Sequence, residues 1–301
     1  MTSRRDILLG CLCAFVSEAI FGIGYVSAKA AMSRAHPLAL LGWRFALAAL
    51  AMGALAAAGV IRVRLRGKPL GRLAAVALLT VLYYAFETAG IALTTASESG
   101  AILACIPVAA LAASTLILRQ KPSRRQTLGI LVTLVGVLAS VFAGGATASF
   151  SPSGYAFLIA AALTYALYCT AVDAAARDFS GVEITLAMLV ALAGTFAPLA
   201  LVRAALNGGA DAVMALLRLP FADGGFLVPL LWLAFCSSIC GFFLANVALA
   251  KAGVNRTASF IGVATAVAIV VGAILLGESF TVAQTVAAAV IVFGVWIANR
   301  V

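Results

Sequence analysis

The chain has 301 residues, of which 64% are hydrophobic and only 10% charged, and its mean hydropathy is +1.16. Soluble domains carry about 25% charged residues, and a fold of this size cannot hide so much apolar surface from water. The composition therefore excludes an ordinary soluble domain and indicates a protein that lies in lipid. In such a protein the positions of the basic residues indicate membrane orientation, so the net charge of +10 does not lead us to expect a nucleic-acid partner.

Apolar runs long enough to cross a bilayer, about 20 residues each, occur ten times along the chain. The first follows the basic start MTSRRD, but it lacks a clear small-residue cleavage site, so we interpret it as a retained span and not a signal peptide. The alternative is nine spans, with one closely linked pair misread. The ten predicted spans are 7–30, 37–60, 73–95, 98–118, 127–144, 153–175, 182–203, 226–250, 256–276 and 281–299.

The placement of lysine and arginine favours the even number of spans. Basic residues gather in the cytoplasmic segments of membrane proteins. With a cytoplasmic N-terminus, 15 of the 20 basic residues fall in cytoplasmic segments, whereas an odd number of spans would place Arg300 outside. We predict a multi-pass protein of a bacterial-type inner membrane with both termini cytoplasmic. The cytoplasmic basic residues would be Arg4, Arg5, Arg62, Arg64, Arg66, Lys68, Arg72, Arg119, Lys121, Arg124, Arg125, Arg177, Lys251, Arg256 and Arg300.

The chain also contains an internal repeat. The segment RQTLGILVTLVGVLA (125–139) resembles AQTVAAAVIVFGVWI (283–297) at an offset of 158 residues, and a second alignment has an offset of 144. Each half holds five spans, so the halves must cross the membrane in opposite directions, which is a signature of transporters. We predict one all-α membrane domain of ten helices, built from inverted repeats 1–150 and 151–301. Paired positions are Gln126 with Gln284, Thr127 with Thr285, Gly136 with Gly294, Gly10 with Gly154, and Lys29 with Asp173.

Three motifs carry a resemblance to a known family: FGIGYVSAKAAM (21–32), GWRFALAALA (42–51) and LLGESFTVAQ (275–284). With them, the whole chain resembles the drug/metabolite transporter superfamily in its ten-helix EamA branch, and it looks most like amino-acid exporters of the YddG type. Two positions depart from the family pattern, because Gln120 stands where a glutamate is frequent and Thr265 where a proline is frequent. The resemblance implies a secondary transporter that works by alternating access.

Glu18 is a carboxylic acid in the middle of the first span. It follows Ile7 by 11 residues, or about 16 Å of helix, which is near the centre of a bilayer. A charged group is expensive at that depth, and the repeat pairs Glu18 with Ala162, so the architecture does not require it. We predict that Glu18 binds a substrate ammonium group or takes part in coupled protonation. The alternative is a structural glutamic acid that holds helices together.

Glu87 lies in the third span, in the motif YYAFETAG. Tyr83 and Tyr84 precede it by four and three residues, so the three side chains share one helix face. A tyrosine combines an apolar ring with a polar tip, which suits the wall of a wet apolar cavity. We predict that the three residues line a substrate pathway. The alternative is a glutamate that faces an outer vestibule and binds nothing.

Arg44 and Lys29 are cations in the outer half of the second and first spans. An arginine can hold a carboxylate through two parallel hydrogen bonds, so we predict that Arg44 binds a substrate carboxylate. A structural pair with Glu87 or Glu18 is equally compatible with the sequence. For Lys29 a substrate role competes with a lysine that snorkels to the membrane surface.

The remaining candidates are aromatic residues for a cavity wall and two residues for gating or helix packing. Aromatic residues in a span more often face lipid or pack, so each wall assignment competes with that interpretation. The wall candidates are Trp43, Tyr165 and Tyr168, with Trp232, Phe242 and Phe243 behind them, and the gating or packing candidates are Pro107 and Asn246.

No metal site or cofactor is expected. The six cysteines all lie in apolar runs, and His36 is the only histidine, so neither a disulfide framework nor a zinc-type spacing exists. An intramembrane enzyme would need a cluster of aspartates or several histidines, and a channel would need a continuous polar pore. The sequence has neither pattern, and it has no glycine-rich phosphate loop for ATP.

These features together predict a secondary transporter and not an enzyme. The first expectation is export of amino acids from the cytoplasm, with a preference for aromatic and other apolar side chains and broad specificity, because both signs of charge inside the membrane suit a zwitterion. The alternatives are a proton-coupled exporter of cationic drugs, and a carrier of nucleosides, sugars or other small metabolites. The expected partners are the small-molecule substrate and the lipid bilayer, protons are a candidate coupling ion, and a monomer is sufficient.

Overall fold

The computed structural model describes residues 4–94, 102–103, 105–119, 121–143, 151–276 and 282–299, and this part of the chain is helical without any strand. The first half forms α1 (Arg4–Met32), α2 (Pro37–Ala57), α3 (Leu70–Leu93), α5 (Ile106–Leu116) and α6 (Arg124–Ala143). The second half forms α7 (Pro152–Ala175), α8 (Gly181–Ala222), α9 (Gly224–Leu231), the π-helix η1 (Trp232–Gly241), α10 (Phe242–Ala252), α11 (Val254–Ser259), α12 (Ile261–Leu276) and α13 (Val282–Asn299).

The helices follow the predicted spans in chain order. Within the described ranges, seven helices are long and apolar enough to cross a membrane, and one of them joins α9, η1 and α10 into a single rod, Gly224–Ala252. Shorter apolar helices occupy the fourth and tenth predicted spans, and α6 occupies the fifth. The start of the fourth span lies outside the described residues. The predicted all-α membrane fold is confirmed.

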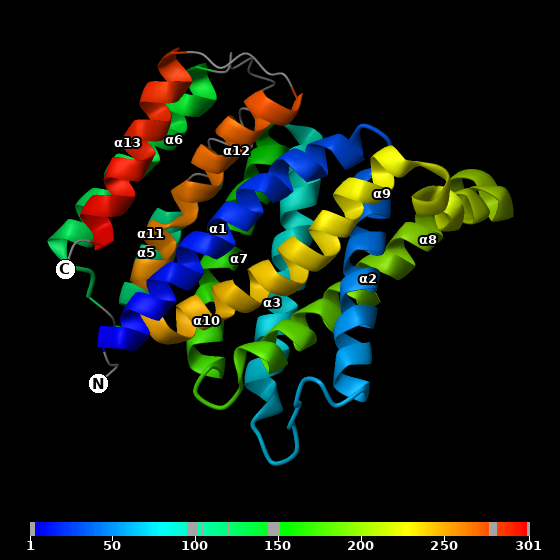
Figure 1. The fold of residues 1–301 in the computed structure, drawn as a ribbon, viewed down its shortest axis with the longest axis horizontal. Helices are drawn as coiled ribbons and strands as arrows, with labels where there is room; N and C mark the ends of the chain where they lie inside the picture. Colours follow the sequence, from blue (N-terminus) through cyan, green and yellow to red (C-terminus); the bar gives the residue numbers. More distant parts are fainter. Residues whose placement is uncertain are drawn as a thin grey trace.

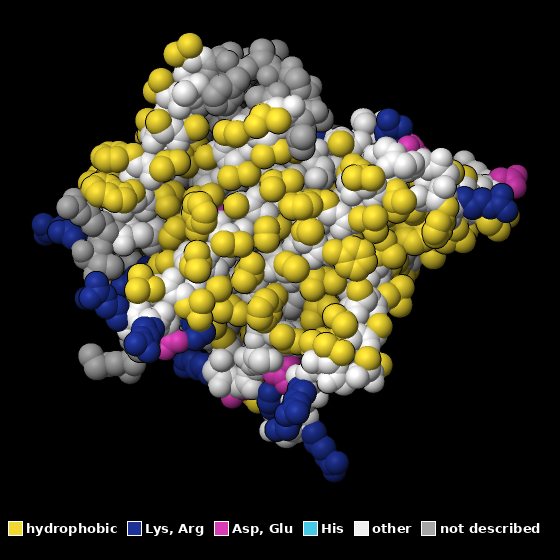
Figure 2. Space-filling model, in the orientation of Figure 1, with side chains coloured by type: hydrophobic (Ala, Val, Ile, Leu, Met, Phe, Trp, Pro, Cys, Tyr) yellow, Lys and Arg dark blue, Asp and Glu magenta, His cyan; other side chains and the backbone are white. Residues whose placement is uncertain are grey.

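The surface of the protein suits a lipid environment. Figure 2 shows apolar side chains over the broad face of the bundle, with lysine and arginine concentrated at its edges. Large apolar side chains such as Leu50, Leu78 and Ile274 are more than half exposed. A contiguous apolar surface of this extent would be unstable in water but is the expected outer face of a membrane protein.

Local sequence signals set the starts of several helices. Pro37 and Pro152 stand at the first helical position, where the missing N–H of proline costs nothing. Ser180 caps α8 by accepting a hydrogen bond from the backbone N–H of Glu183, whose carboxylate reaches back to the Ser180 N–H. This reciprocal capping box fixes the entry of the chain into α8.

The helix contacts follow an approximate two-fold symmetry between the halves. We call the end of the bundle that holds Arg4 and Asn299 the terminal face, and the opposite end the far face (Figure 1). α1 rises from the terminal face, whereas its counterpart α7 descends from the far face. α6 packs against α13 and α2 against α8, while α3 with α7 mirrors α10 with α1, and α5 with α7 mirrors α12 with α1. The halves are therefore inverted repeats.

Close glycine contacts reproduce the repeat residue by residue. A Cβ atom added to Gly136 would lie 2.9 Å from the backbone nitrogen of Ile291, and one added to Gly294 would lie 2.6 Å from that of Thr133. Gly136 and Gly294 are 158 positions apart, and so are Thr133 and Ile291. The two contacts are thus symmetry mates across the α6–α13 interface, with the offset found in the sequence.

The α6–α13 interface depends on glycine, which gives a stability prediction. The substitution Gly294→Ala should lower the free energy of unfolding of the purified protein by about 1–3 kcal/mol, because the new methyl group would meet backbone atoms that cannot move aside. Gly194 on α8 is the matched control, since a Cβ there would meet no atom within 4 Å. Thermal unfolding in detergent checks both variants. Equal melting temperatures for Gly294→Ala and Gly194→Ala would contradict the close packing.

The end of α8 differs from the sequence prediction. The predicted seventh span stops near 203 and a loop is expected after it, but helical structure continues to Ala222. Gly208 and Gly209 break the helix, and Gly209 has a positive φ of 61° that favours glycine. After this break, residues 210–222 form an arm that extends beyond the bundle (Figure 1, olive, right).

Candidate functional site

A pocket of about 450 Å³ lies inside the bundle, bordered by α1, α2, α3, α7, η1 and α10, with one lining residue each from α5, α8 and α12. It extends to the far ends of α1 and α2, where Met32 and Pro37 line it. Toward the terminal face, the largest buried apolar cluster fills the space and includes Phe45, Met52 and Val76. The pocket is therefore a chamber whose lining runs to the far ends of α1 and α2, with this apolar cluster on its terminal side.

Glu18 lies in the wall of this pocket. The residue is only 5% exposed, and within the described part of the chain no hydrogen bond or ion pair engages its carboxyl group. The neighbouring Ser17 hydroxyl is already used, because it donates to the carbonyl oxygen of Ala14 at 2.9 Å. A buried carboxyl group without a partner is unfavourable. Glu18 is thus available to a ligand cation or to a proton.

Arg44 faces the same pocket from α2 and is 8% exposed. Its Nε donates to the Ser238 hydroxyl at 2.8 Å, and its Nη2 donates to the Ser237 hydroxyl at 3.0 Å. The guanidinium carbon also lies 5.1 Å from the ring centre of Phe45 and 5.8 Å from that of Tyr84. Among the described residues no carboxylate forms an ion pair with Arg44. The guanidinium is therefore held in place by hydroxyls and rings, with the Glu87 carboxylate as a charged neighbour but no ion pair among the described residues.

Glu87 and Tyr83 line the pocket as a bonded pair on α3. The Tyr83 hydroxyl donates to a carboxylate oxygen of Glu87 at 2.5 Å, as the four-residue spacing allows. Unlike Glu18, Glu87 has one of its acceptor sites occupied by the protein. The two acidic groups of the pocket are therefore not equivalent.

A series of tyrosines forms one wall of the pocket. The ring centres of Tyr83 and Tyr84 are 5.2 Å apart, those of Tyr83 and Tyr165 are 5.2 Å apart, and those of Tyr165 and Tyr168 are 5.4 Å apart. Tyr25 lines the pocket from α1. Such a wall offers flat apolar surface together with hydroxyl groups, and it suits an aromatic or amphipathic ligand.

Two predicted site residues lie away from the pocket lining. Lys29 is exposed near the far end of α1. The indole N–H of Trp43 donates to the carbonyl oxygen of Leu216 at 2.9 Å, and its ring meets Phe221 edge-on. Trp43 thus packs under the arm that follows Gly209, which the sequence did not predict as a helix. Neither placement supports a direct role in the pocket.

The two gating or packing candidates lie beside the pocket. Asn246 on α10 is fully buried, accepts a hydrogen bond from Tyr168 at 2.9 Å, and donates one to Thr185 at 2.9 Å. It links α7, α8 and α10 beneath the chamber, as the helix-packing alternative expects. Pro107 is buried in the first turn of α5, next to Ile106, which lines the pocket.

Sequence reasoning missed two groups of polar residues. Ser237 and Ser238 form the only adjacent pair of hydroxyl residues in the segment Gly224–Ala252, and that doublet was the available signal. The second group is at the terminal face, where the motif SGVE (180–183) has the spacing of a capping box. Neither group could be connected to its partners without the tertiary structure.

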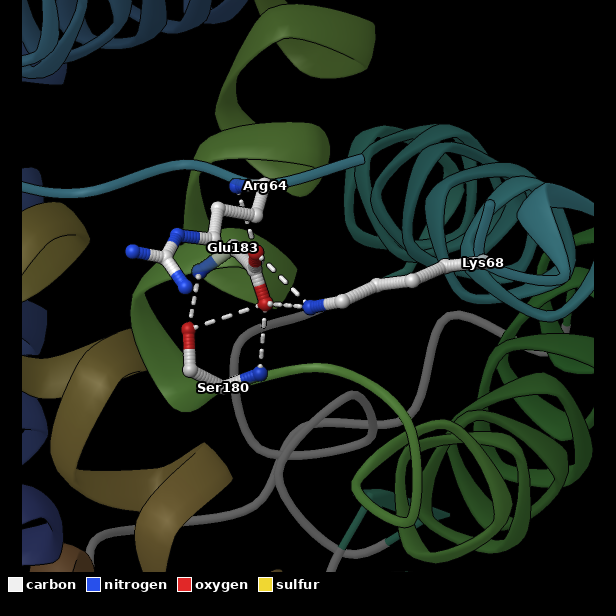
Figure 3. A network of polar contacts seen from close by, with 4 residues as sticks. All are labelled: Arg64, Lys68, Ser180 and Glu183. Atoms are coloured by element: carbon white, nitrogen blue, oxygen red, sulfur yellow. Dashed lines mark hydrogen bonds and ion pairs between the residues drawn. The ribbon is translucent and has the colours of Figure 1, made fainter. Parts of the chain in front are cut away.

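The terminal face is held closed by contacts between the two halves. Figure 3 shows polar groups converging on the carboxylate of Glu183. It accepts hydrogen bonds from Lys68 Nζ at 2.8 and 2.9 Å and from the backbone N–H of Arg64 at 2.8 Å. Nearby, Arg72 pairs with Asp178 at 2.5 Å. The α2–α3 loop is thereby fixed to the start of α8, on the terminal side of the pocket.

The model of the "EamA-like transporter family" matches the chain twice, over residues 8–142 and 152–300. The chain belongs to this family. It is 28% identical, over 286 residues, to the "Uncharacterized transporter YcxC" of Bacillus subtilis (strain 168), and the match covers 94% of this chain and 90% of the relative. A solved crystal structure aligns with a TM-score of 0.75 and 16% identity over 97% of this chain and 98% of its own.

The protein is therefore an EamA-like membrane transporter, and the superfamily resemblance is confirmed. The two matches of the family model correspond to the two inverted halves of the bundle. The pocket lies between these halves, where transporters built from inverted repeats bind their substrates. The residues in its wall are thus the candidates for substrate contact.

Proposed function

We propose that this EamA-like transporter exports amino acids by recognising both charges of the zwitterion. The proposal rests on one acidic and one basic side chain, Glu18 and Arg44, which are both buried and both line one pocket. Neither forms an ion pair within the described residues. A bound amino acid would satisfy Glu18 with its ammonium group and Arg44 with its carboxylate, while the tyrosine wall would contact a large apolar side chain.

Transport of tryptophan and phenylalanine tests the proposal. Purified protein in liposomes loaded with unlabelled L-tryptophan should take up labelled L-tryptophan and L-phenylalanine by exchange. Tryptamine, which lacks the carboxylate, should compete at least about tenfold less well, because it leaves a buried guanidinium without a partner. The tyrosine wall and the two acids also fit a cationic drug. Uptake of a quaternary ammonium dye as fast as that of tryptophan would favour drug export instead.

We also propose that the terminal face is cytoplasmic. Most basic residues lie in its loops, for example in the α2–α3 loop, as is usual for cytoplasmic segments. The pocket then faces outward in this structure, and the contacts of Glu183 and Asp178 close its cytoplasmic side. Alternating access requires that these contacts separate when the chamber opens to the cytoplasm.

The orientation can be measured with single cysteines in a cysteine-free background. Cysteine at exposed Arg66, in the α2–α3 loop, should resist an impermeant maleimide in intact cells and react after the membrane is opened. Cysteine at exposed Asp211, on the arm, should react in intact cells. The reverse pattern would place the pocket mouth on the cytoplasmic side and would contradict export through an outward-facing state.

A further inference from the structure

The π-helix η1 is a local departure from the symmetry of the fold. It spans Trp232–Gly241, whereas the symmetry-related helix α3 is a regular α-helix throughout. Within η1 the Ser238 hydroxyl donates to the carbonyl oxygen of Leu233, five residues earlier, at 2.9 Å. π-Helical segments are rare and are frequently found at functional sites. The symmetry of the halves therefore does not explain η1.

The contacts of η1 are directed at one edge of the Arg44 guanidinium. Ser238 accepts from Nε and Ser237 accepts from Nη2, so two adjacent hydroxyls bind the side edge of the fork. A guanidinium has five N–H donors, and a carboxylate can bind either the Nε–Nη2 edge or the Nη1–Nη2 end. The serines occupy the first edge, and the Tyr84 hydroxyl is a further hydrogen-bonding neighbour of the guanidinium. A ligand carboxylate would meet the remaining donors, at the Nη1–Nη2 end.

Aromatic rings restrict the same guanidinium further. Phe45, Tyr84 and Phe242 lie with their ring centres 5.1, 5.8 and 6.0 Å from the guanidinium carbon. The hydroxyls on one edge of the Arg44 guanidinium and the rings around it leave this group little freedom to rotate. A donor pair that is already oriented binds a carboxylate more tightly, because less conformational freedom is lost on binding.

We propose that Ser237 and Ser238 are positioning residues that orient Arg44 so that its Nη1–Nη2 end binds a substrate carboxylate. They set the preference of the transporter for ligands with a carboxylate over amines that lack one. The inference rests on the proposed amino-acid transport, and it adds that η1 is the element that makes Arg44 selective. Ser237 lines the pocket and Ser238 does not, and in this arrangement both act through Arg44.

Serine-to-alanine variants test the proposal in liposomes. Ser237→Ala removes only the hydrogen bond to Nη2, so we expect normal folding and a KM for L-tryptophan that rises about tenfold, with kcat changed less than twofold. Inhibition by tryptamine should stay the same, so the preference for tryptophan over tryptamine falls by the same factor.

Ser237→Thr keeps a hydroxyl and should retain much of the preference. Cys236→Ala, on the same π-helix and outside the pocket lining, is the matched control and should behave as wild type.

Each outcome has a distinct meaning. A wild-type protein that exchanges no amino acid would overturn the proposed function and, with it, this inference. Wild-type exchange together with an unchanged KM and unchanged tryptamine preference in folded Ser237→Ala would overturn the inference alone. A fall in kcat with an unchanged preference would assign the serines to the movement of η1 and would also overturn the positioning role. If Ser238→Ala fails to fold, because it also loses the bond to Leu233, Ser237→Ala still decides.

Discussion

Substitution of Arg44 by glutamine should reduce amino-acid transport at least about 100-fold. The guanidinium is buried and is the only cation among the described residues that line the pocket. Removal of one partner of a buried ion pair costs about 3–5 kcal/mol, and a factor of ten corresponds to about 1.4 kcal/mol. The loss should appear in exchange of labelled L-tryptophan by protein that elutes as a single species in detergent.

Two further variants make the Arg44 result specific. Arg44→Lys keeps the charge but not the planar fork, so it should recover only part of the activity. Arg34 is a suitable control because its ion pair with Asp223, at 3.1 Å, is exposed and outside the pocket lining. Arg34→Gln should stay within about twofold of wild type, since exposed ion pairs contribute little. Full activity in folded Arg44→Gln would show that Arg44 does not bind a substrate carboxylate.

Substitution of Glu18 by glutamine should cause a loss of similar size. Glutamine has the same shape but cannot attract an ammonium ion, and no described protein group replaces the interaction. Expression and elution should be normal, because Glu18 has no described partner to lose. Glu87→Gln should be milder, since the Glu87 carboxylate is already engaged by Tyr83. Uptake of labelled L-tryptophan by the two variants, compared at equal protein, checks the ranking.

The pH dependence of the Glu18 variant separates two roles. If protonation of Glu18 is coupled to transport, the pH dependence of wild-type uptake should disappear in Glu18→Gln. If Glu18 only binds the ammonium group, residual uptake should keep the wild-type pH dependence. Wild-type rates in Glu18→Gln, combined with poor expression of Glu18→Ala, would show instead that the residue is structural.

Much of the fold could be predicted because lipid imposes strong patterns on sequence. Long apolar runs indicate the spans, and the repeat offset pairs Gly136 with Gly294, which lie as symmetry mates in the α6–α13 interface. The arm after Gly209 was not predicted, because NGGAD (207–211) has the composition of a turn and the following helix is defined by its contacts with Trp43. Residues 210–222 are mostly apolar but too few to span a bilayer, so the sequence does not mark them as a span.

The pocket could be predicted in part. A carboxylate or arginine inside a membrane is conspicuous, so Glu18 and Arg44 were found from the sequence, as was the pair Tyr83 and Glu87. The serines of η1 were missed because a hydroxyl in a membrane helix usually bonds to its own backbone and carries little sequence signal. Their significance comes from the distance to Arg44, which is 194 residues away along the chain for Ser238.

Binding of three ligands that share an indole ring distinguishes zwitterion recognition from recognition of a single charge. L-Tryptophan carries both charges, tryptamine carries only the ammonium group, and indole-3-propionate carries only the carboxylate. Calorimetry in nanodiscs can compare their binding to wild type, Arg44→Gln and Glu18→Gln. We expect wild type to bind tryptophan at least about 50-fold more tightly than either other ligand, given the cost of an unpaired buried charge. Arg44→Gln should bind tryptophan no better than tryptamine, and Glu18→Gln should bind it no better than indole-3-propionate. Equal binding of tryptophan and tryptamine by wild type would contradict zwitterion recognition in this pocket.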